Sequence, residues 1–353
     1  MRWQMRKRLL APGDIEPTTE GWQVLGVFNP GVFESPDGRV ILVARVAEVP
    51  IAERDGMVAL PVWCPGRGPV VQWEPAAEWE AVDRRVFRHR HTGQIRLSSV
   101  SHLRLFDCGG GAEVPRPIGR IVPEHAWELY GIEDARVTCI DGVFYMTYVG
   151  VSEWGICTGW AISRDGHTWQ RQGILLPPDN KDVVFFPRKV ADRFVIIHRP
   201  MCSLRWSRPA MWLAYSQDGV HFGEHVRLYG GGSADWDADR VGAGPPPVYW
   251  EGRWLVVYHG SAVAQPPAVG RYAAGVMVLD GEDPCRIMGI TRRPLLVPEE
   301  PFERDGFVPE VVFPTGVICR DERLWLYYGA ADTAVAVAAG SVADMLADVQ
   351  PVT

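Results

Sequence analysis

GIEDARVTCIDGVFYMTYVG, residues 131–150, sets the pattern for the whole chain. Its first part holds two acids and a base, Glu133, Asp134 and Arg136, among apolar neighbours. Its second part begins with Asp141-Gly142, a dipeptide typical of hairpin turns, and continues as an apolar and aromatic run that favours a β-strand. The stretch therefore predicts two paired strands with a charged cluster on the first. Such a cluster is either a surface ion pair, since most charged residues lie outside the core, or part of a functional site.

The turn-strand unit of this stretch recurs along the chain. Five copies occur: PDGRVILVAR (36–45), DGVFYMTYVG (141–150), ADRFVIIHRP (191–200), EGRWLVVYHG (251–260) and DERLWLYYGA (321–330). Two further hairpins are expected after apolar strands, at SRDGHTW (163–169) and SQDGVHF (216–222). Repeated turn-strand units at such intervals are typical of β-propellers, in which each blade is one four-stranded sheet. The sequence thus predicts an all-β, five-bladed β-propeller, with a β-sandwich as the alternative.

The composition is that of a folded chain with many turns. It has 353 residues, 47% of them hydrophobic, with 37 glycines and 29 prolines. We expect a single propeller domain over 1–353, with an N-terminal arm at 1–20 and an insertion or elaborated blade at 57–107. That second region contains a basic run, RRVFRHRH (84–91), which is either a solvated loop or a lid or oligomer contact near the site. Helices are expected only at Val342–Val349 and at Ala76–Val82.

Charge, cysteine pattern and apolar runs restrict the partners and the compartment. The net charge of −7 and the absence of a basic face argue against a nucleic-acid partner. The seven cysteines are scattered and form no CxxC pair, which argues against a disulfide framework or a zinc site and fits a reducing compartment. The N-terminal apolar run is too short for a signal peptide, and no apolar run is long enough for a transmembrane helix. We expect a cytoplasmic protein with no membrane partner.

Polar residues lie at the ends of the repeated strands, which a propeller directs toward one central pocket. Inward-pointing charge is costly unless it is paired or used, so the pattern suggests a ligand, although each residue alone could be a solvated or core position. Four basic residues could form an anion site, because guanidinium groups and lysine bind phosphate: Arg45, Lys181, Arg199 and His259. Asp134 and Glu310 could bind sugar hydroxyls or transfer protons. An acid beside an anion site, in a chain with 15 tryptophans, indicates glycosyl transfer to phosphate.

At these residues the chain resembles glycoside hydrolase family 130, the mannoside phosphorylases and related β-mannosidases, which are five-bladed β-propellers. The resemblance extends from Asn29 to about Asp332. It rests on the order and spacing of NPGVF (29–33), IEDARVT (132–138), NKDVVFFP (180–187), HRP (198–200), GAGPPP (242–247), YHG (258–260), VVFPTG (311–316) and YYGAAD (327–332). In the acid motif this chain has Ala135 where the family commonly has proline, which we expect to change only local stiffness. The segment 57–107 matches no motif of the family.

The resemblance implies a role for each residue. Asp134 would be the general acid, protonating the leaving oxygen through the 3-hydroxyl of the mannose, while inorganic phosphate attacks the anomeric carbon from the opposite face to give α-mannose 1-phosphate. Arg45, Lys181, Arg199 and His259 would bind the phosphate. The mannose would be bound by Asn29, Arg136, Glu310 and Asp332. Phosphate would be the co-substrate of a small oligosaccharide, with no metal or other cofactor.

Two other functions stay open from the sequence. An inverting β-mannosidase of the same fold would need a second carboxylate to activate water, and Glu124, Glu128 and Asp237 are candidates. A non-catalytic sugar-binding propeller would give no reason for the basic residues. The retained basic set favours phosphorolysis. The linkage (β-1,2 or β-1,4) and the acceptor sugar do not follow from the sequence, and a homo-oligomer is possible.

Overall fold

Each of the five predicted turn-strand units forms the second strand of a β-hairpin in the computed structural model, which describes residues 3–201, 207–232, 235–263 and 269–352. The turns use backbone conformations with positive φ at Gly38, Asp141, Asp192, Glu251 and Asp321, as tight hairpins require. The five second strands are β3 (Val40–Pro50), β12 (Val143–Ser152), β16 (Phe194–Pro200), β21 (Arg253–Ser261) and β25 (Arg323–Ala330). The chain is therefore all-β, as predicted.

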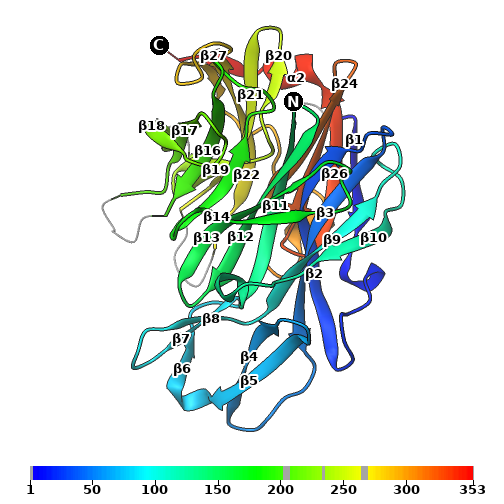
Figure 1. The fold of residues 1–353 in the computed structure, drawn as a ribbon, viewed down its shortest axis with the longest axis vertical. Helices are drawn as coiled ribbons and strands as arrows, with labels where there is room; N and C mark the ends of the chain where they lie inside the picture. Colours follow the sequence, from blue (N-terminus) through cyan, green and yellow to red (C-terminus); the bar gives the residue numbers. More distant parts are fainter. Residues whose placement is uncertain (1–2, 202–206, 233–234, 264–268, 353) are drawn as a thin grey trace.

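Antiparallel neighbours extend each hairpin into a larger unit (Figure 1). The first unit contains β2 (Trp22–Glu34), β3, β9 (Val100–Asp107) and β10 (Arg116–Ile121), and the second contains β11 (Gly131–Ile140), β12, β13 (Gly155–Ser163) and β14 (Gln170–Leu176). The third contains β15 (Asn180–Phe185), β16, β17 (Met211–Ser216) and β18 (Gly223–Tyr229). The fourth contains β19 (Arg240–Ala243), β20 (Val248–Trp250), β21, β22 (Tyr272–Asp280), β23 (Ile287–Thr291) and β27 (Val349–Pro351).

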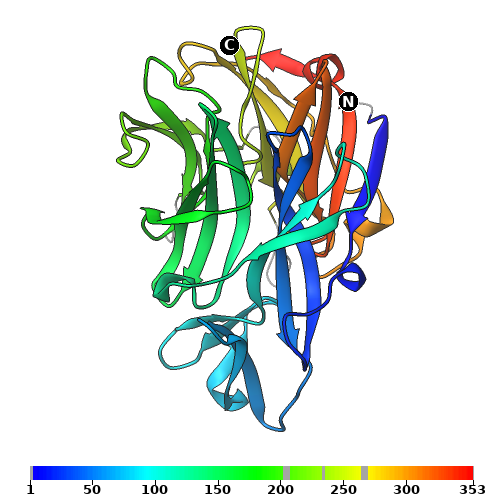
Figure 2. The same cartoon turned by 45° about the vertical axis from the view of Figure 1, so that its right-hand side comes forward.

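The fifth unit joins the two ends of the chain. It contains β24 (Val312–Arg320), β25, β26 (Ala334–Ser341) and β1 (Met5–Leu10), and β1 pairs antiparallel with β26. Figure 2 shows β1 in blue alongside the red strand β26. Residues 1–20, expected as an N-terminal arm, therefore include a strand of this sheet.

Hydrophobic cores lie between successive units. Clusters of buried side chains connect the first unit with the second, the second with the third, the third with the fourth and the fourth with the fifth. A further cluster packs Leu10 of β1 and Val335 of β26 against Val27 and Leu42 of the first unit. Each inner sheet is thus covered on both faces, which explains why its strands carry continuous apolar runs.

The predicted SRDGHTW and SQDGVHF hairpins connect the third and fourth strands of the second and third units. Asp165 accepts hydrogen bonds from the backbone N–H groups of His167 and Thr168, and Asp218 does the same for Val220 and His221. These donors lower the pKa of both carboxyls. The shared S-x-D-G signature is therefore a turn device, in which serine and aspartate satisfy the loop backbone.

Residues between β3 and β9 leave the first unit and form two small sheets, drawn at the bottom of Figure 1. One is a hairpin of β4 (Met57–Cys64) and β5 (Gly68–Pro75), and the other contains β6 (Trp79–Ala81), β7 (Val86–His89) and β8 (Ile95–Leu97). The predicted insertion thus separates into these sheets at 57–97 and β9 at 100–107, which pairs with β3. Part of its basic run is balanced locally, because Glu80 pairs with Arg88 and Arg90.

Helices are short. They are the 3-10 turns at Pro12–Asp14, Ala76–Glu78, Ala126–Glu128 and Asp235–Asp237, and the α-helices α1 (Pro301–Arg304) and α2 (Val342–Leu346). The tail helix is confirmed at its start, where Ser341 caps it, but β27 follows because residues 349–351 pair with β23. The helix expected at Ala76–Val82 was wrong beyond its first turn, since Trp79 is buried and begins β6. Among the described residues, no helix has the length and apolar character needed to cross a membrane.

Candidate active site

Bulges in the innermost strands direct polar side chains away from the sheets. Asn29 in β2, Asp134 in β11 and Asp182 in β15 all have left-handed backbone, with φ of 48°, 51° and 55°. In each strand the pairing register shifts at that point. Such a bulge inserts an unpaired residue that re-aims its side chain, and Asn and Asp tolerate this conformation better than most residues. The same device thus places a polar group at equivalent points of three units.

Two glycines provide the space that these side chains occupy. A Cβ on Gly329 would collide with the side-chain oxygen of Asn29. A Cβ on Gly242 would collide with the Asp182 carboxylate and the His259 ring. Gly329 of the YYGAAD motif and Gly242 of the GAGPPP motif are therefore required by close approach to the site.

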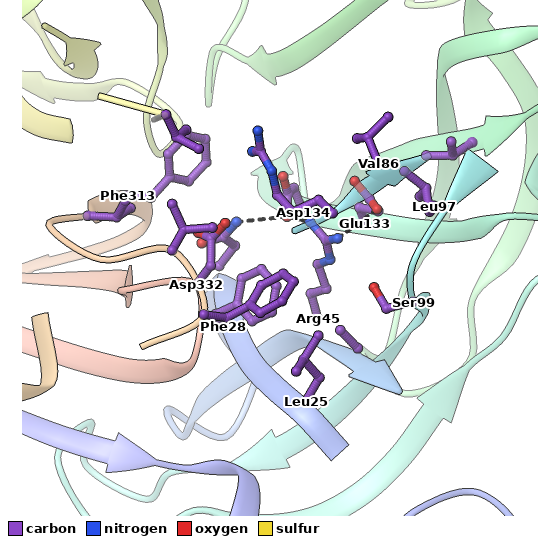
Figure 3. Close-up of a pocket in the computed structure, with 18 of the residues that line it drawn as sticks. Leu25, Phe28, Arg45, Val86, Leu97, Ser99, Glu133, Asp134, Phe313 and Asp332 are labelled. Atoms are coloured by element: carbon purple, nitrogen blue, oxygen red, sulfur yellow. Dashed lines mark hydrogen bonds and ion pairs between the residues drawn. The ribbon is translucent and has the colours of Figure 1, made fainter. Parts of the chain in front are cut away.

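A cavity of about 280 Å³ opens beside the first two bulges. In Figure 3, Glu133, Asp134 and Arg45 lie between Phe313 and Asp332 on one side and Val86 and Leu97 on the other. The charged residues that line the cavity are Arg45, Arg85, Glu133, Asp134, Lys181, Arg240 and Asp332. The cavity therefore combines three carboxylates with four basic side chains.

Asp134 is held in place by two neighbours. The side-chain amide of Asn29 donates to Asp134 Oδ1 at 2.9 Å, and Arg45 lies 3.4 Å from the same oxygen. Arg45 also pairs with Glu133 at 2.7 Å and donates to Ser101 Oγ at 3.0 Å. Burial alone would lower the pKa of Arg45, but the Glu133 and Asp134 carboxylates outweigh it and raise that pKa. Arg45 is thus a fixed cation in contact with the predicted acid.

Glu133 and Asp332 lie in the same cavity and resist ionisation. Burial raises the pKa of Glu133; Arg45 opposes this effect and Asp134 adds to it. Burial likewise raises the pKa of Asp332 to about 6, against the attraction of Arg45 and Arg85. Burial therefore favours the protonated forms of Glu133 and Asp332, although basic side chains line the same cavity.

Replacing Asp332 by Asn should stabilise the protein above pH 6. The pKa of Asp332 is about 6 in the folded chain and about 4 in the unfolded chain, so between these pH values only the folded chain keeps the proton. The free energy of unfolding therefore falls as the pH rises through this range. We expect Asp332→Asn to gain about 2 kcal/mol at pH 7 and almost nothing at pH 4. Chemical denaturation between about pH 4 and 7 measures the free energy of unfolding of the variant and the wild type. Asp321→Asn, at an exposed turn that also has positive φ, is the control, and equal behaviour of the two variants would contradict the account.

A second cluster of charge is buried behind the cavity around Asp182. Arg199 approaches the Asp182 carboxylate at 3.1 Å, His259 at 3.3 Å and Arg136 at 3.5 Å. Burial opposes ionisation of Asp182, but Arg199 and His259 outweigh it and the pKa lies well below its usual value. Burial lowers the pKa of His259 to about 4 despite the Asp182 carboxylate, so the ring is neutral at pH 7. Asp182 therefore compensates two buried guanidinium groups.

Lys181 connects this Asp182 cluster to the cavity. It lines the cavity, and it is the register partner of Arg199 across β15 and β16. Burial and the nearby Arg199 lower its pKa. An anion bound in the cavity would favour its charged form, because opposite charge at short range stabilises an ammonium group.

The structure separates the predicted site residues into three groups. Five of them line the cavity: Asn29, Arg45, Asp134, Lys181 and Asp332. Three lie in the Asp182 cluster, namely Arg136, Arg199 and His259. Arg136, predicted to bind mannose, has a buried guanidinium that donates to the backbone oxygens of Ala243 and Gly244.

Glu310 is the predicted residue that falls outside both groups. Its carboxylate is partly exposed and pairs with Arg271 at 3.3 Å, in a neighbouring groove. The three carboxylates considered as a hydrolytic base do not line the cavity either. Glu124 is exposed, Glu128 accepts from Tyr148 at 2.8 Å and Asp237 accepts from Tyr229 at 2.8 Å.

Several residues of the site were missed by the sequence analysis. Asp182 stands in the quoted NKDVVFFP motif, and its place before a buried run, like that of Asp134, was the available signal. Glu133 adjoins Asp134 and could have been included on the same ground. Arg85, Arg240 and Tyr272 line the cavity from three other segments, and no local pattern distinguishes them from solvated residues.

A cavity lined by three carboxylates and four basic side chains in an all-β chain suits an enzyme that acts on carbohydrates and anions. The family model described as beta-1,4-mannooligosaccharide phosphorylase matches residues 44–350. The chain belongs to glycoside hydrolase family 130, which confirms the family predicted from the motifs.

Characterised relatives cover most of the chain. The chain is 33% identical over 337 residues to the beta-1,2-mannobiose phosphorylase of Listeria innocua serovar 6a, covering 93% of this chain and 92% of the relative. It is 35% identical over 216 residues to the 1,2-beta-oligomannan phosphorylase of a Thermoanaerobacter species, covering 60% of this chain and 68% of that one. The solved structure of the Listeria innocua enzyme in complex with beta-1,2-mannobiose matches with a TM-score of 0.88 at 32% identity, over 96% of both chains.

Proposed function

We propose that this protein is an inverting phosphorylase that cleaves β-linked mannosides with inorganic phosphate and releases α-mannose 1-phosphate. The observation that carries the proposal is the cavity in which Asp134 lies beside Arg45 and Lys181. Phosphorylase relatives that cover most of the chain support it. An acid and a phosphate-binding set in one cavity are the two parts that phosphorolysis needs.

Asp134 acts as the acid. Its proton passes to the leaving sugar oxygen, directly or through the 3-hydroxyl of the bound mannose, as the bond from the anomeric carbon to that oxygen breaks. A phosphate oxygen forms the new bond from the opposite face, so the β-linkage becomes an α-phosphate. Phosphate is already an anionic nucleophile, so no second carboxylate is needed to activate it, unlike water in an inverting hydrolase. The Asn29 amide and Arg45 orient the Asp134 carboxyl for this transfer.

Phosphate is bound by Arg45 and Lys181, with the Asp182 cluster behind them. Arg45 is already paired with Glu133, and Lys181 lies next to Arg199. Arg199 contributes positive charge and the neutral His259 ring contributes hydrogen-bonding capacity, both from positions that are almost fully buried. A phosphate dianion in the cavity is stabilised by the lining cations and by the buried cluster behind them. Charge-assisted hydrogen bonds are stronger where water is excluded.

The site is proposed to lie at the centre of a five-bladed propeller. The closed sequence of cores supports this arrangement, since the cluster of Leu10 and Val27 joins the last unit to the first. Bulged inner strands of three units supply Asn29, Asp134 and Asp182. In a propeller these strands surround the central channel, so equivalent positions face one another.

The linkage is proposed to be β-1,2, because the relative that covers 93% of this chain is named for that linkage. The reaction is proposed to need no metal or organic cofactor and to occur in the cytoplasm. The test incubates the protein with β-1,2- and β-1,4-mannobiose, with and without phosphate, in the presence of EDTA. Phosphate-dependent consumption of β-1,2-mannobiose is expected. Equal release of free mannose without phosphate would overturn the proposal in favour of hydrolysis.

Replacing Lys181 by Ala should weaken phosphate binding specifically. The lysine supplies a positive charge to the cavity wall, and losing one charge-assisted contact costs about 1.5–3 kcal/mol. We expect the KM for phosphate to rise by about 10–100-fold, with a smaller change in the KM for mannobiose. Initial rates at varied phosphate measure this. Lys189→Ala, which removes a lysine packed on Phe194 away from the cavity, should leave the phosphate KM as it is. A matching rise in both variants would refute the assignment.

A further inference from the structure

His198, in the HRP motif, differs from the residues that occupy its position in other units of the fold. The last four turn-strand units each have a buried ring at their eighth position, namely Tyr148, His198, Tyr258 and Tyr328. The three tyrosines donate to buried carboxylates at 2.8, 3.5 and 2.6 Å, which belong to Glu128, Asp237 and Glu303. The third unit has an imidazole with different partners in place of this tyrosine and its carboxylate.

His198 connects the protein surface to the strand that carries Lys181. Its Nε2 atom lies 3.0 Å from Nδ1 of His225, on the exposed edge strand β18. Its Nδ1 atom lies 3.0 Å from the side-chain amide nitrogen of Asn180. Asn180 is the first residue of β15, directly before Lys181, and its backbone oxygen accepts from Thr158 of β13 at 3.1 Å. A continuous chain of hydrogen bonds therefore leads from His225 to the start of β15.

The start of β15 depends on such contacts because its pairing is interrupted next to Lys181. The strand pairs with β16 at Asn180 and Lys181, and the register then shifts before Val184. Asp182 lies within this shift and has a φ of 55°. Lys181 is thus held between the bulge on one side and the contacts of Asn180 on the other.

We propose that His198 is a positioning residue for phosphate binding, which holds Lys181 in the cavity wall through Asn180 and loses this hold when His225 takes up a proton. His198 is not among the residues that line the cavity, so it acts on phosphate through β15 and not by contact. The inference rests on the phosphate role proposed for Lys181.

The direction of the hydrogen bonds makes the chain sensitive to protonation. The Asn180 amide N–H donates to His198 Nδ1, so the His198 proton is on Nε2 and is donated to His225 Nδ1. A protonated His225 has N–H groups at both ring nitrogens and cannot accept this bond. Moving the His198 proton to Nδ1 would place it against the Asn180 N–H group. Proton uptake at His225 therefore breaks one of the two hydrogen bonds or rotates the Asn180 amide.

A proton added to the pair rests on His225. This residue lies on an exposed strand, and histidine is the side chain that takes up a proton on mild acidification. Burial and the neighbouring His225 lower the pKa of His198 to about 4. The titratable residues on the described segments beside the pair are Asp179, Lys181 and Asp182 at β15, Arg199 of β16, Tyr215 of β17, Glu224 and Arg227 of β18 and Arg240 of β19. All of them remain in a variant that changes His225 alone, so such a variant isolates its proton.

Two substitutions of His198 separate positioning from packing. Asparagine places an acceptor at the position of Nδ1 and keeps the bond from Asn180, whereas glutamine reaches toward His225 and loses that bond. We expect His198→Gln to raise the KM for phosphate by about tenfold with little change in kcat, and His198→Asn to stay within about threefold of wild type. Initial rates at varied phosphate and saturating β-1,2-mannobiose measure both variants. A purely structural role would lower kcat in both, through loss of folded protein, and leave the KM unchanged.

His225→Asn tests the proton, because asparagine keeps an acceptor toward His198 and does not titrate. From about pH 7.5 to 5.5 the KM for phosphate should rise about fivefold more in the wild type than in this variant. Ionisation of phosphate itself affects both proteins equally. The control is His221→Asn, which changes an exposed histidine that bonds to Asp218 in the turn before β18, and it should follow the wild type.

Three results would count against these assignments. Equal phosphate KM values for His198→Gln and His198→Asn, or the same pH dependence in wild type and His225→Asn, would overturn the inference alone. An unchanged phosphate KM in Lys181→Ala would overturn the phosphate role of Lys181 and the inference with it. Absence of phosphate-dependent product from the wild type would overturn the proposed function.

Discussion

Asp134→Asn should reduce phosphorolysis by about a thousandfold while leaving the fold intact. Loss of a positioned general acid costs typically 10²–10⁴ in rate, about 3–5 kcal/mol. Asparagine keeps the oxygen that accepts from the Asn29 amide, and it tolerates the φ of 51° at this bulge. The measurement is the initial rate of phosphate-dependent product formation at saturating phosphate and mannoside.

Two observations control for damage to the site. The thermal transition of Asp134→Asn should stay within a degree or two of wild type, and the KM for phosphate should change little. Asp134→Ala is a poorer variant, because alanine at positive φ adds backbone strain to the lost carboxyl. A rate within tenfold of wild type would show that another group supplies the proton, and Asp332 and Glu133 would be the first to examine.

Asp182→Asn should be the most destabilising of the conservative site substitutions. The carboxylate is buried and faces the guanidinium groups of Arg136 and Arg199, so its removal leaves both without compensation. Breaking a buried ion pair by removing one partner costs about 3–5 kcal/mol. We expect a loss of this size in the free energy of unfolding at pH 7, together with loss of activity, measured by denaturant unfolding and initial rates.

Asp141→Asn is the matched control for this variant. Asp141 also has a left-handed backbone, with a φ of 50°, but it lies in the exposed turn between β11 and β12. Its substitution should change stability by less than about 0.5 kcal/mol. If Asp182→Asn were as stable as Asp141→Asn, the Asp182 cluster would not carry the compensating role described here.

The hairpins were predictable because their information is local. Asp141-Gly142 and the equivalent turns demand positive φ, and the runs after them carry the apolar residues that a sheet buried on both faces needs. Asp134, Arg45 and Lys181 were predictable as cavity residues because repeated strands place equivalent ends together. The family motifs contain Asp134 and Lys181.

The remaining parts depend on contacts between distant segments. Nothing in residues 5–10 specifies that they pair with β26, over 300 residues away. Arg85 lines the cavity because the inserted segment that contains it lies next to the cavity. Glu310 does not line the cavity, and its carboxylate pairs with Arg271. Asp182 and Arg136 could have been solvated charges, and only their mutual burial identifies them as a compensated cluster.

The most direct test of the central claim follows the phosphorus. The protein is incubated with β-1,2-mannobiose and inorganic phosphate, and phosphorus NMR records the products with time. The account predicts that the inorganic phosphate signal decreases as one α-mannose 1-phosphate signal grows, in equal amounts with released mannose. Mannose release with the inorganic phosphate signal unchanged would contradict phosphorolysis, and a β-configured phosphate product would contradict inversion.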